Sequence, residues 1–105
     1  MRQFLTEVEL ADCEAEPRPF HAYAVRFAAK EAFSKALGTG VMGTMSWHDM
    51  AVGRDERGNT ALQLTGRARQ TVDALGIDRV HLSLTQERDT AAAVVLLERA
   101  GLREP

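Results

Sequence analysis

The spacing of hydrophobic side chains predicts two helices in the first part of the chain. Residues 2–15 place apolar side chains among acidic ones, and Thr6 has a glutamate three residues later, which is the spacing of a capping box. Two prolines end this helix, and the second, Pro19, suits the first turn of a new helix. We expect the second helix to continue to about Leu37, where Gly38 supplies a left-handed C-terminal cap.

The middle of the chain predicts a glycine loop followed by a β-hairpin. Residues 38–46 contain three glycines and no charge, which suits a backbone that comes close to a ligand, although a flexible connector is the alternative. Residues 47–54 and 60–65 have the pattern of strands, and the turn 55–59 between them includes a glycine where positive φ is favoured. The two segments are therefore expected to pair as antiparallel strands.

A third, smaller helix and a half-buried strand follow. The helix is predicted at residues 66–75, ends at Gly76, and has an inner face made of Ala68, Val72 and Leu75. Residues 79–85 alternate strictly between apolar and polar side chains, as in a strand with one buried face. The apolar face carries Val80, Leu82 and Leu84, and the polar face carries His81, Ser83 and Thr85.

The last predicted element is a strand at residues 90–97. Both of its faces are apolar and charges bound it, as expected of a strand covered on both sides, although its alanines leave a helix as the alternative. Residues 98–105 are expected to form a solvated tail. Together, the elements predict an α+β fold in which a small antiparallel sheet packs with a long central helix and shorter helices.

Composition narrows the class of protein without naming a function. A chain of 105 residues with 45% hydrophobic content predicts one globular domain, residues 1–105. The net charge of -2 gives no basic field for nucleic acid. The single cysteine, Cys13, is expected to be a small buried side chain. No apolar run is long enough to span a bilayer and the N-terminus lacks a signal-peptide layout, so a cytoplasmic protein is expected.

The pair Glu31 and Lys35 is the leading candidate for chemistry. The two residues are four apart and share a helix face, where most such pairs are merely solvated. Glu31, however, falls on a stripe with aromatic residues such as Phe20 and Phe27, which is expected to face the core and should then be apolar. Lys35 is followed directly by the glycine loop. A carboxylate, an ammonium group and a glycine loop can hold Mg²⁺ and the phosphates that it bridges, although the dipole at the end of this helix disfavours anions.

Two further groups have weaker support. His81 could donate to a phosphate or act in proton transfer, but its polar neighbours favour the alternative that it belongs to the wet face of a sheet. Ser83 lacks the surroundings of a nucleophile. Scattered arginines could offer a basic surface to an acidic partner or simply solvate the chain. These are Arg54, Arg57, Arg67, Arg69 and Arg79.

The longest motif is the segment 26–40, which reads Arg-Phe-Ala-Ala-Lys-Glu-Ala-Phe-Ser-Lys-Ala-Leu-Gly-Thr-Gly. It resembles the signature of the small bacterial 4'-phosphopantetheinyl transferases called holo-acyl-carrier-protein synthases. The likeness continues through Trp47-His-Asp-Met, Asp55-Glu-Arg-Gly, Leu64-Thr-Gly and His81-Leu-Ser-Leu-Thr. It extends to the alanine-rich last strand and so covers nearly the whole chain.

The resemblance implies the fold of that family and its reaction. Such enzymes transfer the phosphopantetheine arm of coenzyme A to a serine of an acyl carrier protein and release 3',5'-ADP, with Mg²⁺ on the pyrophosphate. By resemblance, Glu31 is the metal ligand, and Glu31 and Lys35 are the catalytic residues. The residues implied to bind the coenzyme are Arg26, Lys35, Gly38, Thr39, Gly40, His81 and Thr85.

The resemblance also implies partners. Family members are typically homotrimers with their sites at subunit interfaces, and basic surface residues recognise an acidic helix of the carrier protein. A place in fatty acid biosynthesis follows, with neither nucleic acid nor membrane as a partner.

The sequence departs from the family pattern in two places. Family members begin with a strand that bears a Gly-x-Asp motif, whose aspartate is the other protein ligand of the metal. This chain aligns only after that strand, so its domain is expected to be N-terminally shortened, and Thr60 stands where proline is usual. Three alternatives stay open: a transferase with altered metal ligation, a non-catalytic homologue that binds coenzyme A or carrier protein without turnover, and a fragment completed by another chain.

Overall fold

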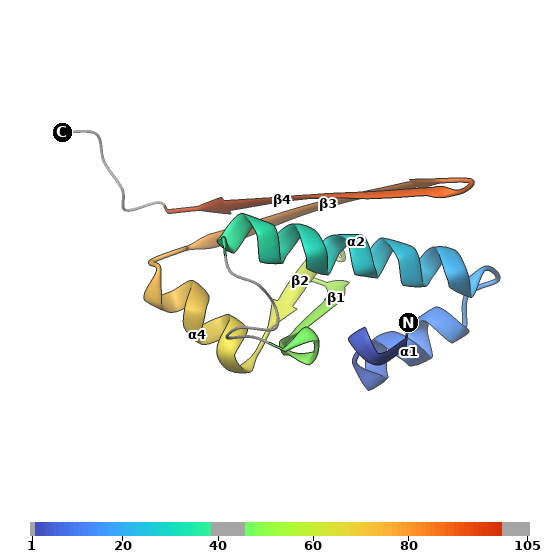
Figure 1. Cartoon of the computed structure of the whole chain (residues 1–105), viewed down its shortest axis with the longest axis horizontal. Coiled ribbons are helices and arrows are strands. Elements are labelled where there is room, and N and C mark those ends of the chain that lie inside the picture. The colour runs from blue at the N-terminus through green and yellow to red at the C-terminus, as the bar shows by residue number, and fades with distance from the viewer. Residues whose placement is uncertain (1, 39–45, 100–105) are drawn as a thin grey trace.

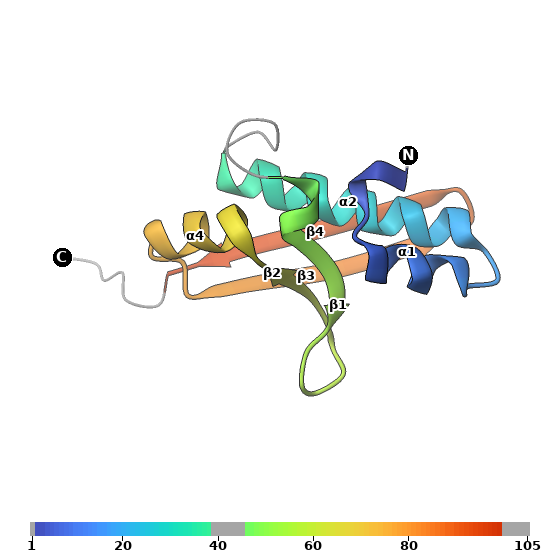
Figure 2. The same ribbon diagram turned by 90° about the horizontal axis from the view of Figure 1, so that it is seen from below.

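The computed structural model describes residues 2–38 and 46–99. In chain order, its elements are η1 (Arg2–Phe4), α1 (Glu7–Glu14), α2 (Pro19–Leu37), η2 (Trp47–Asp49), β1 (Met50–Arg54), β2 (Thr60–Leu64), α4 (Gly66–Ala74), β3 (Arg79–Glu87) and β4 (Thr90–Glu98). The β3–β4 hairpin covers one side of the molecule, and α2 runs along it beneath β4 (Figure 1). The remaining elements lie on the other side of α2, with α1 and α4 towards opposite ends (Figure 2).

The N-terminal helix predicted at residues 2–15 is shorter than expected, and that boundary was wrong. A 3-10 turn precedes Thr6, and α1 begins only after it. The Thr6 hydroxyl accepts a hydrogen bond from Glu9 N at 3.2 Å, while Glu9 Oε1 accepts one from Thr6 N at 3.0 Å. This reciprocal capping box was predicted, and because it requires an extended N-cap residue, it places the start of the helix at Glu7.

The central helix α2 has the bounds that the sequence predicts. Pro19 occupies its first turn, and Gly38 follows Leu37 with a φ of 79°, in the left-handed region where glycine has no steric penalty. The Gly38 N–H donates to the Lys35 carbonyl at 3.1 Å and ends the helix. Among the described helices, none is both long and apolar enough to cross a membrane.

The first hairpin pairs β1 with β2 as predicted, but β1 begins later than expected. Residues 47–49 form the 3-10 turn η2 instead of extended strand, because the Ser46 hydroxyl accepts from His48 N at 3.2 Å and Asp49 Oδ2 accepts from Ser46 N at 3.2 Å. Gly58 has a φ of 84°, as the turn requires. Within the described residues, β1 and β2 form one two-stranded sheet and β3 and β4 form another, both antiparallel.

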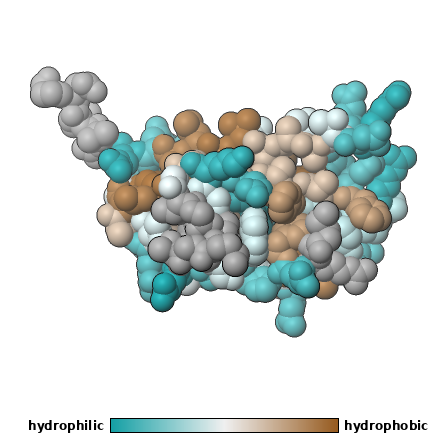
Figure 3. Space-filling model, in the orientation of Figure 1, coloured by the Kyte–Doolittle hydropathy of each residue, from teal (hydrophilic) through white to brown (hydrophobic). Residues whose placement is uncertain are grey.

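The second hairpin confirms the strict alternation of β3 and the strand assignment of β4. Val80, Leu82 and Leu84 point inward, opposite Leu97, Val95 and Ala93 of β4. The prediction that β4 is covered on both sides is wrong for this chain, because Val94 and Leu96 are 65% and 60% exposed. Hydrophobic atoms accordingly line the edge of the molecule over β3 and β4 (Figure 3). The expected tail begins later than residue 98, since β4 includes Glu98, and residues 100–105 lie outside the described residues.

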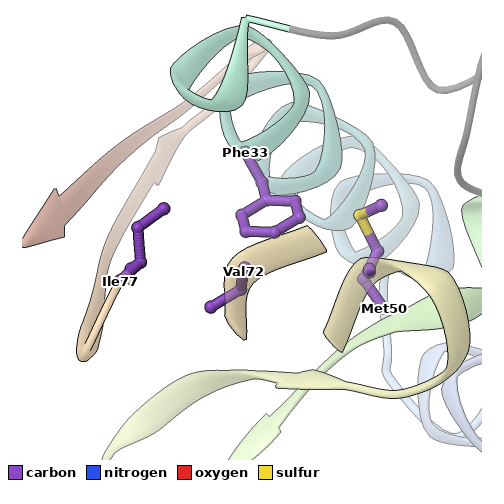
Figure 4. Packing of buried hydrophobic residues seen from close by; sticks show 5 residues of the cluster. Phe33, Met50, Val72 and Ile77 are labelled. Carbon is purple, nitrogen blue, oxygen red and sulfur yellow. The ribbon is translucent and has the colours of Figure 1, made fainter. Parts of the chain in front are cut away.

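The main core lies where α2, α4 and both hairpins meet. It is built from Phe33, Met50, Ala68, Val72 and Ile77 (Figure 4). Ala68 and Val72 face inward as predicted, whereas the prediction for Leu75 is wrong, since this side chain caps the end of α4 and is 40% exposed. A second cluster joins η1, α1 and the first half of α2. It contains Phe4, Leu5, Cys13, Ala22 and Tyr23, and so confirms that Cys13 is buried.

Candidate functional site

Glu31 and Lys35 lie on the outer side of α2. Phe33 is wholly buried, and because each helical residue turns by 100°, Glu31 falls nearly opposite it. The predicted stripe of Glu31 with aromatic residues is real, but the inference that it faces the core is wrong: Phe20 is 76% exposed and Phe27 is 38% exposed. Glu31 is half-buried and Lys35 is exposed. The carboxylate therefore needs no buried partner, and its side chain is accessible to a ligand.

Neither side chain of this pair is engaged within the described part of the chain. No ion pair or hydrogen bond joins Glu31 or Lys35 side-chain atoms to another described residue. The predicted glycine loop starts at Gly38, directly after this face of α2, while Thr39 and Gly40 lie outside the described residues. A carboxylate and an ammonium group thus lie one helical turn apart, and no residue of the described ranges takes up their hydrogen-bonding capacity.

A magnesium ion with phosphate ligands is compatible with this donor set. Mg²⁺ keeps several waters and commonly takes one or two protein carboxylates together with substrate phosphates. Glu31 supplies one accessible carboxylate. No cluster of three or more His, Cys, Asp or Glu side chains that could hold a metal occurs among residues 2–38 and 46–99. The described residues therefore fit a metal held mainly by its substrate, with Glu31 as a protein ligand.

His81 and Thr85 lie on the outer face of the β3–β4 hairpin, whose inner face packs on the core next to α2. Both side chains are exposed, as the alternation of β3 predicts. His81 Nε2 lies 3.1 Å from Glu98 Oε1 on β4, with both side chains about half exposed. Because the hairpin separates its outer face from α2, His81 and Thr85 do not meet Glu31 within one chain.

Arg26 lies in a cleft away from both Glu31 and His81. Its Nη1 donates to the Ala22 carbonyl at 3.2 Å, and its Nε is buried without a partner among the described residues. The side chain lines an open cleft of about 800 Å³ between α1, α2, β1 and the end of β3. Arg18 and Arg54 line the same cleft, whereas Glu31, Lys35 and His81 do not. The predicted site residues are thus divided among the outer side of α2, this cleft and the outer face of the hairpin.

The sequence analysis missed a buried ion pair between Lys30 and Glu9. Lys30 Nζ donates to Glu9 Oε1 at 2.6 Å, to the Phe4 carbonyl at 2.6 Å and to the Trp47 carbonyl at 3.1 Å. The two side chains are 0% and 1% exposed. Burial lowers the pKa of Lys30, and its hydrogen bond to Glu9 opposes that shift. Each N–H of the ammonium group has an acceptor, so the buried charge is fully satisfied.

Glu9 connects this pair to two further segments. Its Oε1 also accepts from Thr6 N, and its Oε2 accepts from Val52 N of β1 at 2.8 Å. One signal was present in the sequence: Lys30 lies three residues before Phe33 and so shares its buried face. Glu9 gave no such signal beyond its capping role, because its contact with Lys30 spans 21 residues.

Comparisons with known proteins identify the family of the chain. A sequence model described as the 4'-phosphopantetheinyl transferase superfamily matches residues 1–95. A holo-[acyl-carrier-protein] synthase from Vibrio cholerae is 43% identical over 98 residues, which are 93% of this chain and 78% of the relative.

Solved structures show the same likeness. The holo-[acyl-carrier-protein] synthase of Neisseria meningitidis superposes with a TM-score of 0.82 at 38% identity, covering 91% of this chain and 77% of the other. The enzyme of the same name from Bacillus anthracis, solved in complex with CoA (3',5'-ADP), gives a TM-score of 0.74 at 35% identity over 95% of this chain and 80% of the other. The predicted α+β fold of this family is confirmed. The chain therefore belongs to the holo-acyl-carrier-protein synthases of the 4'-phosphopantetheinyl transferase superfamily.

Proposed function

We propose that this chain transfers the 4'-phosphopantetheine arm of coenzyme A to a serine of an apo acyl carrier protein. The serine oxygen attacks the phosphorus that carries the arm and releases its proton to solvent. The bond from that phosphorus to the bridging oxygen of the pyrophosphate breaks, and 3',5'-ADP leaves with the bonding electrons. Membership of the holo-acyl-carrier-protein synthases supports this reaction.

The observation that carries the proposal is the accessible pair on α2. Glu31 and Lys35 lie one turn apart, and neither is engaged by another described residue. We assign Lys35 to the pyrophosphate, where its ammonium group neutralises the charge that develops on the leaving group. We assign Glu31 to a magnesium ion, and Gly38, with Thr39 and Gly40 after it, to the coenzyme. When bound, Mg²⁺ would neutralise the pyrophosphate oxygens.

A second copy of the chain would complete the site. His81 and Thr85 cannot reach Glu31 within one chain, because they lie on the outer face of the hairpin. The same face exposes Val94 and Leu96, and apolar surface of this kind is typical of interfaces between proteins. We propose that the oligomer is a homotrimer, as the resemblance to the family implies, and that His81, Thr85 and Arg26 bind nucleotide phosphates at the contacts between its subunits.

The carrier protein is the proposed macromolecular partner. Exposed arginines on the hairpin turn and α4 supply positive charge that an acidic carrier helix could meet. Arg57 and Arg67 are both exposed, and no ion pair engages either within the described residues. Arg69 is less available, since it already pairs with Asp73 at 2.8 Å.

The test is a mass measurement on the carrier protein. Incubated with coenzyme A and Mg²⁺, the chain should add the mass of one phosphopantetheine arm to an apo carrier protein. Glu31→Gln, which keeps the shape but removes the charge, should slow the transfer on the order of 100-fold, because the charge on the metal side of the site is lost. Glu56→Gln, an exposed carboxylate in the hairpin turn, is the matched control and should transfer normally.

The outcomes separate the alternatives. Transfer at the normal rate by Glu31→Gln would remove Glu31 from the site. Binding of coenzyme A by the unaltered chain without any transfer, beside an active control enzyme, would favour the non-catalytic homologue instead.

A further inference from the structure

We propose that Lys30 and Glu9 are positioning residues for the transfer reaction, because their buried pair fixes Trp47, whose ring packs on Phe27 one helical turn before Glu31. This inference rests on the proposed function. It concerns neither the metal nor the coenzyme directly, since both side chains are inaccessible to a ligand. Lys30 binds the carbonyls of Phe4 and Trp47 in addition to Glu9. We call these four groups the clamp.

Two attachments to α2 lie before and after the candidate site along the helix axis: the clamp at Lys30 and the cap at Gly38. The chain leaves α2 at Gly38, whose N–H is bound to the Lys35 carbonyl. It returns at Trp47, whose carbonyl accepts from Lys30. Lys30 and Gly38 are separated by roughly 12 Å along the helix, at 1.5 Å per residue. Along the helix axis, Glu31 and Lys35 lie between these two attachments.

The clamp also sets the aromatic side chains that border Glu31. The Trp47 ring lies 5.8 Å from the Phe27 ring at an interplanar angle of 35°, and the Phe4 ring lies 5.3 Å from Phe27 at 79°. Phe27 is one helical turn before Glu31 and is 38% exposed. Lys30 binds the backbone carbonyls of both Phe4 and Trp47, so a shift of the clamp would move the two rings that pack on Phe27, one helical turn before Glu31.

The position of the groups next to Glu31 should affect the rate of arm transfer more than the affinity for the substrates. A displacement of about 1 Å can cost on the order of 100-fold in rate, because reacting groups must be held in near-attack positions. Both side chains of the clamp are held by several hydrogen bonds. The ammonium group has three acceptors, and Glu9 is in turn fixed by Thr6 N and Val52 N. Removing Lys30 alone would leave the Glu9 charge buried, so a single variant would confuse instability with misplacement.

A double variant separates the two effects. Lys30→Met with Glu9→Gln removes both charges together, and the glutamine oxygen can still accept from Val52 N. We expect a melting temperature close to that of the unaltered chain, a fall of at least about tenfold in kcat for arm transfer, and little change in KM for the carrier protein. Should this variant not fold, Lys30→Gln with Glu9→Gln removes both charges but keeps a hydrogen-bond donor at residue 30, and should show a smaller fall in kcat.

Trp47 gives a readout that is independent of activity. It is the single tryptophan of the chain, so its fluorescence reports on the clamp directly. Acrylamide should quench it more strongly in the double variant. The control is Glu56→Gln, which removes one exposed charge in the hairpin turn and should change neither kcat nor quenching.

Two results would overturn the inference. One is a double variant that keeps its melting temperature and transfers the arm at the normal rate. The other is unchanged quenching of Trp47. Absence of transfer by the unaltered chain would instead count against the proposed function, and the quenching measurement would then decide alone whether Lys30 and Glu9 fix Trp47.

Discussion

Two lysines five residues apart on α2 have opposite environments. Lys30 is fully buried and binds three oxygens, whereas Lys35 is exposed and binds none among the described residues. The difference follows from a rotation of about 140° around the helix axis. The same rotation decides their proposed roles, since a saturated buried ammonium can only position its neighbours, while an exposed one can meet a phosphate.

The buried Cys13 thiol predicts how the unfolding free energy of the chain depends on pH. Burial raises the pKa of this thiol above its ordinary value of 9.0, because the thiolate is disfavoured in the apolar cluster. The pKa of the Cys13 thiol is therefore higher in the folded chain than in the unfolded chain. Its contribution to stability is fully present at pH values below the unfolded-state pKa, and it is lost as the pH rises through the folded-state pKa. Relative to Cys13→Ala, the unaltered chain should therefore lose unfolding free energy as the pH rises through 9.0 and above. Urea unfolding of both proteins at each pH would measure this change.

The rate at which the Cys13 thiol reacts with a labelling reagent is the control for this prediction. Since the side chain is 0% exposed, iodoacetamide should label it far more slowly in buffer than in denaturing urea. A difference in stability that does not vary with pH, or rapid labelling of the folded chain, would contradict the buried environment.

At the scale of elements, local signals predicted both ends of α2 and the cap of α1, but they placed the first helix and the first strand too early in the chain. The capping box at Thr6 and the left-handed Gly38 were both predicted, because each depends on residues within one turn. The turn at Trp47 was missed. It forms because Ser46 and Asp49 cap each other, and that short pattern also suits an extended strand in sequence.

Thr6→Ala tests the capping box. Loss of the hydroxyl leaves Glu9 N without its acceptor and should lower the unfolding free energy by about 1 kcal/mol. Chemical denaturation would measure it. Thr71→Ala is the matched control: the Thr71 hydroxyl binds the Arg67 carbonyl inside α4, where alanine is the better helix former. Equal losses in both variants would mean that the cap at Thr6 contributes nothing specific.

At the scale of the whole molecule, the arrangement of layers divides the predicted site. The β3–β4 hairpin packs its inner face towards α2 and the core, and leaves His81, Val94 and Leu96 outside. Glu31 lies on the outer side of α2. These two surfaces can meet only between copies of the chain, so the proposed catalytic site and the proposed oligomer depend on each other.

Subunit complementation tests that dependence. Glu31→Gln and His81→Ala should each be nearly inactive alone. Co-expressed in equal amounts, they should regain arm transfer, because about a quarter of the interfaces would then pair an intact Glu31 with an intact His81. The rate of mass gain on the carrier protein would measure the recovery. No recovery in mixed oligomers, with their composition verified by native mass spectrometry, would place both residues in the same chain's site.

The sequence by itself determined the type and order of the elements, the capping of α1 and α2, the alternation of β3 and the family to which the chain belongs. These depend on residues close together in the chain, or on motifs that survive without knowledge of packing. Tertiary structure alone decided which side of α2 faces the core, that Glu9 meets Lys30, and that one face of β4 is uncovered. Each of these results from contacts between distant segments, where burial and shape choose among faces that the local pattern leaves equivalent.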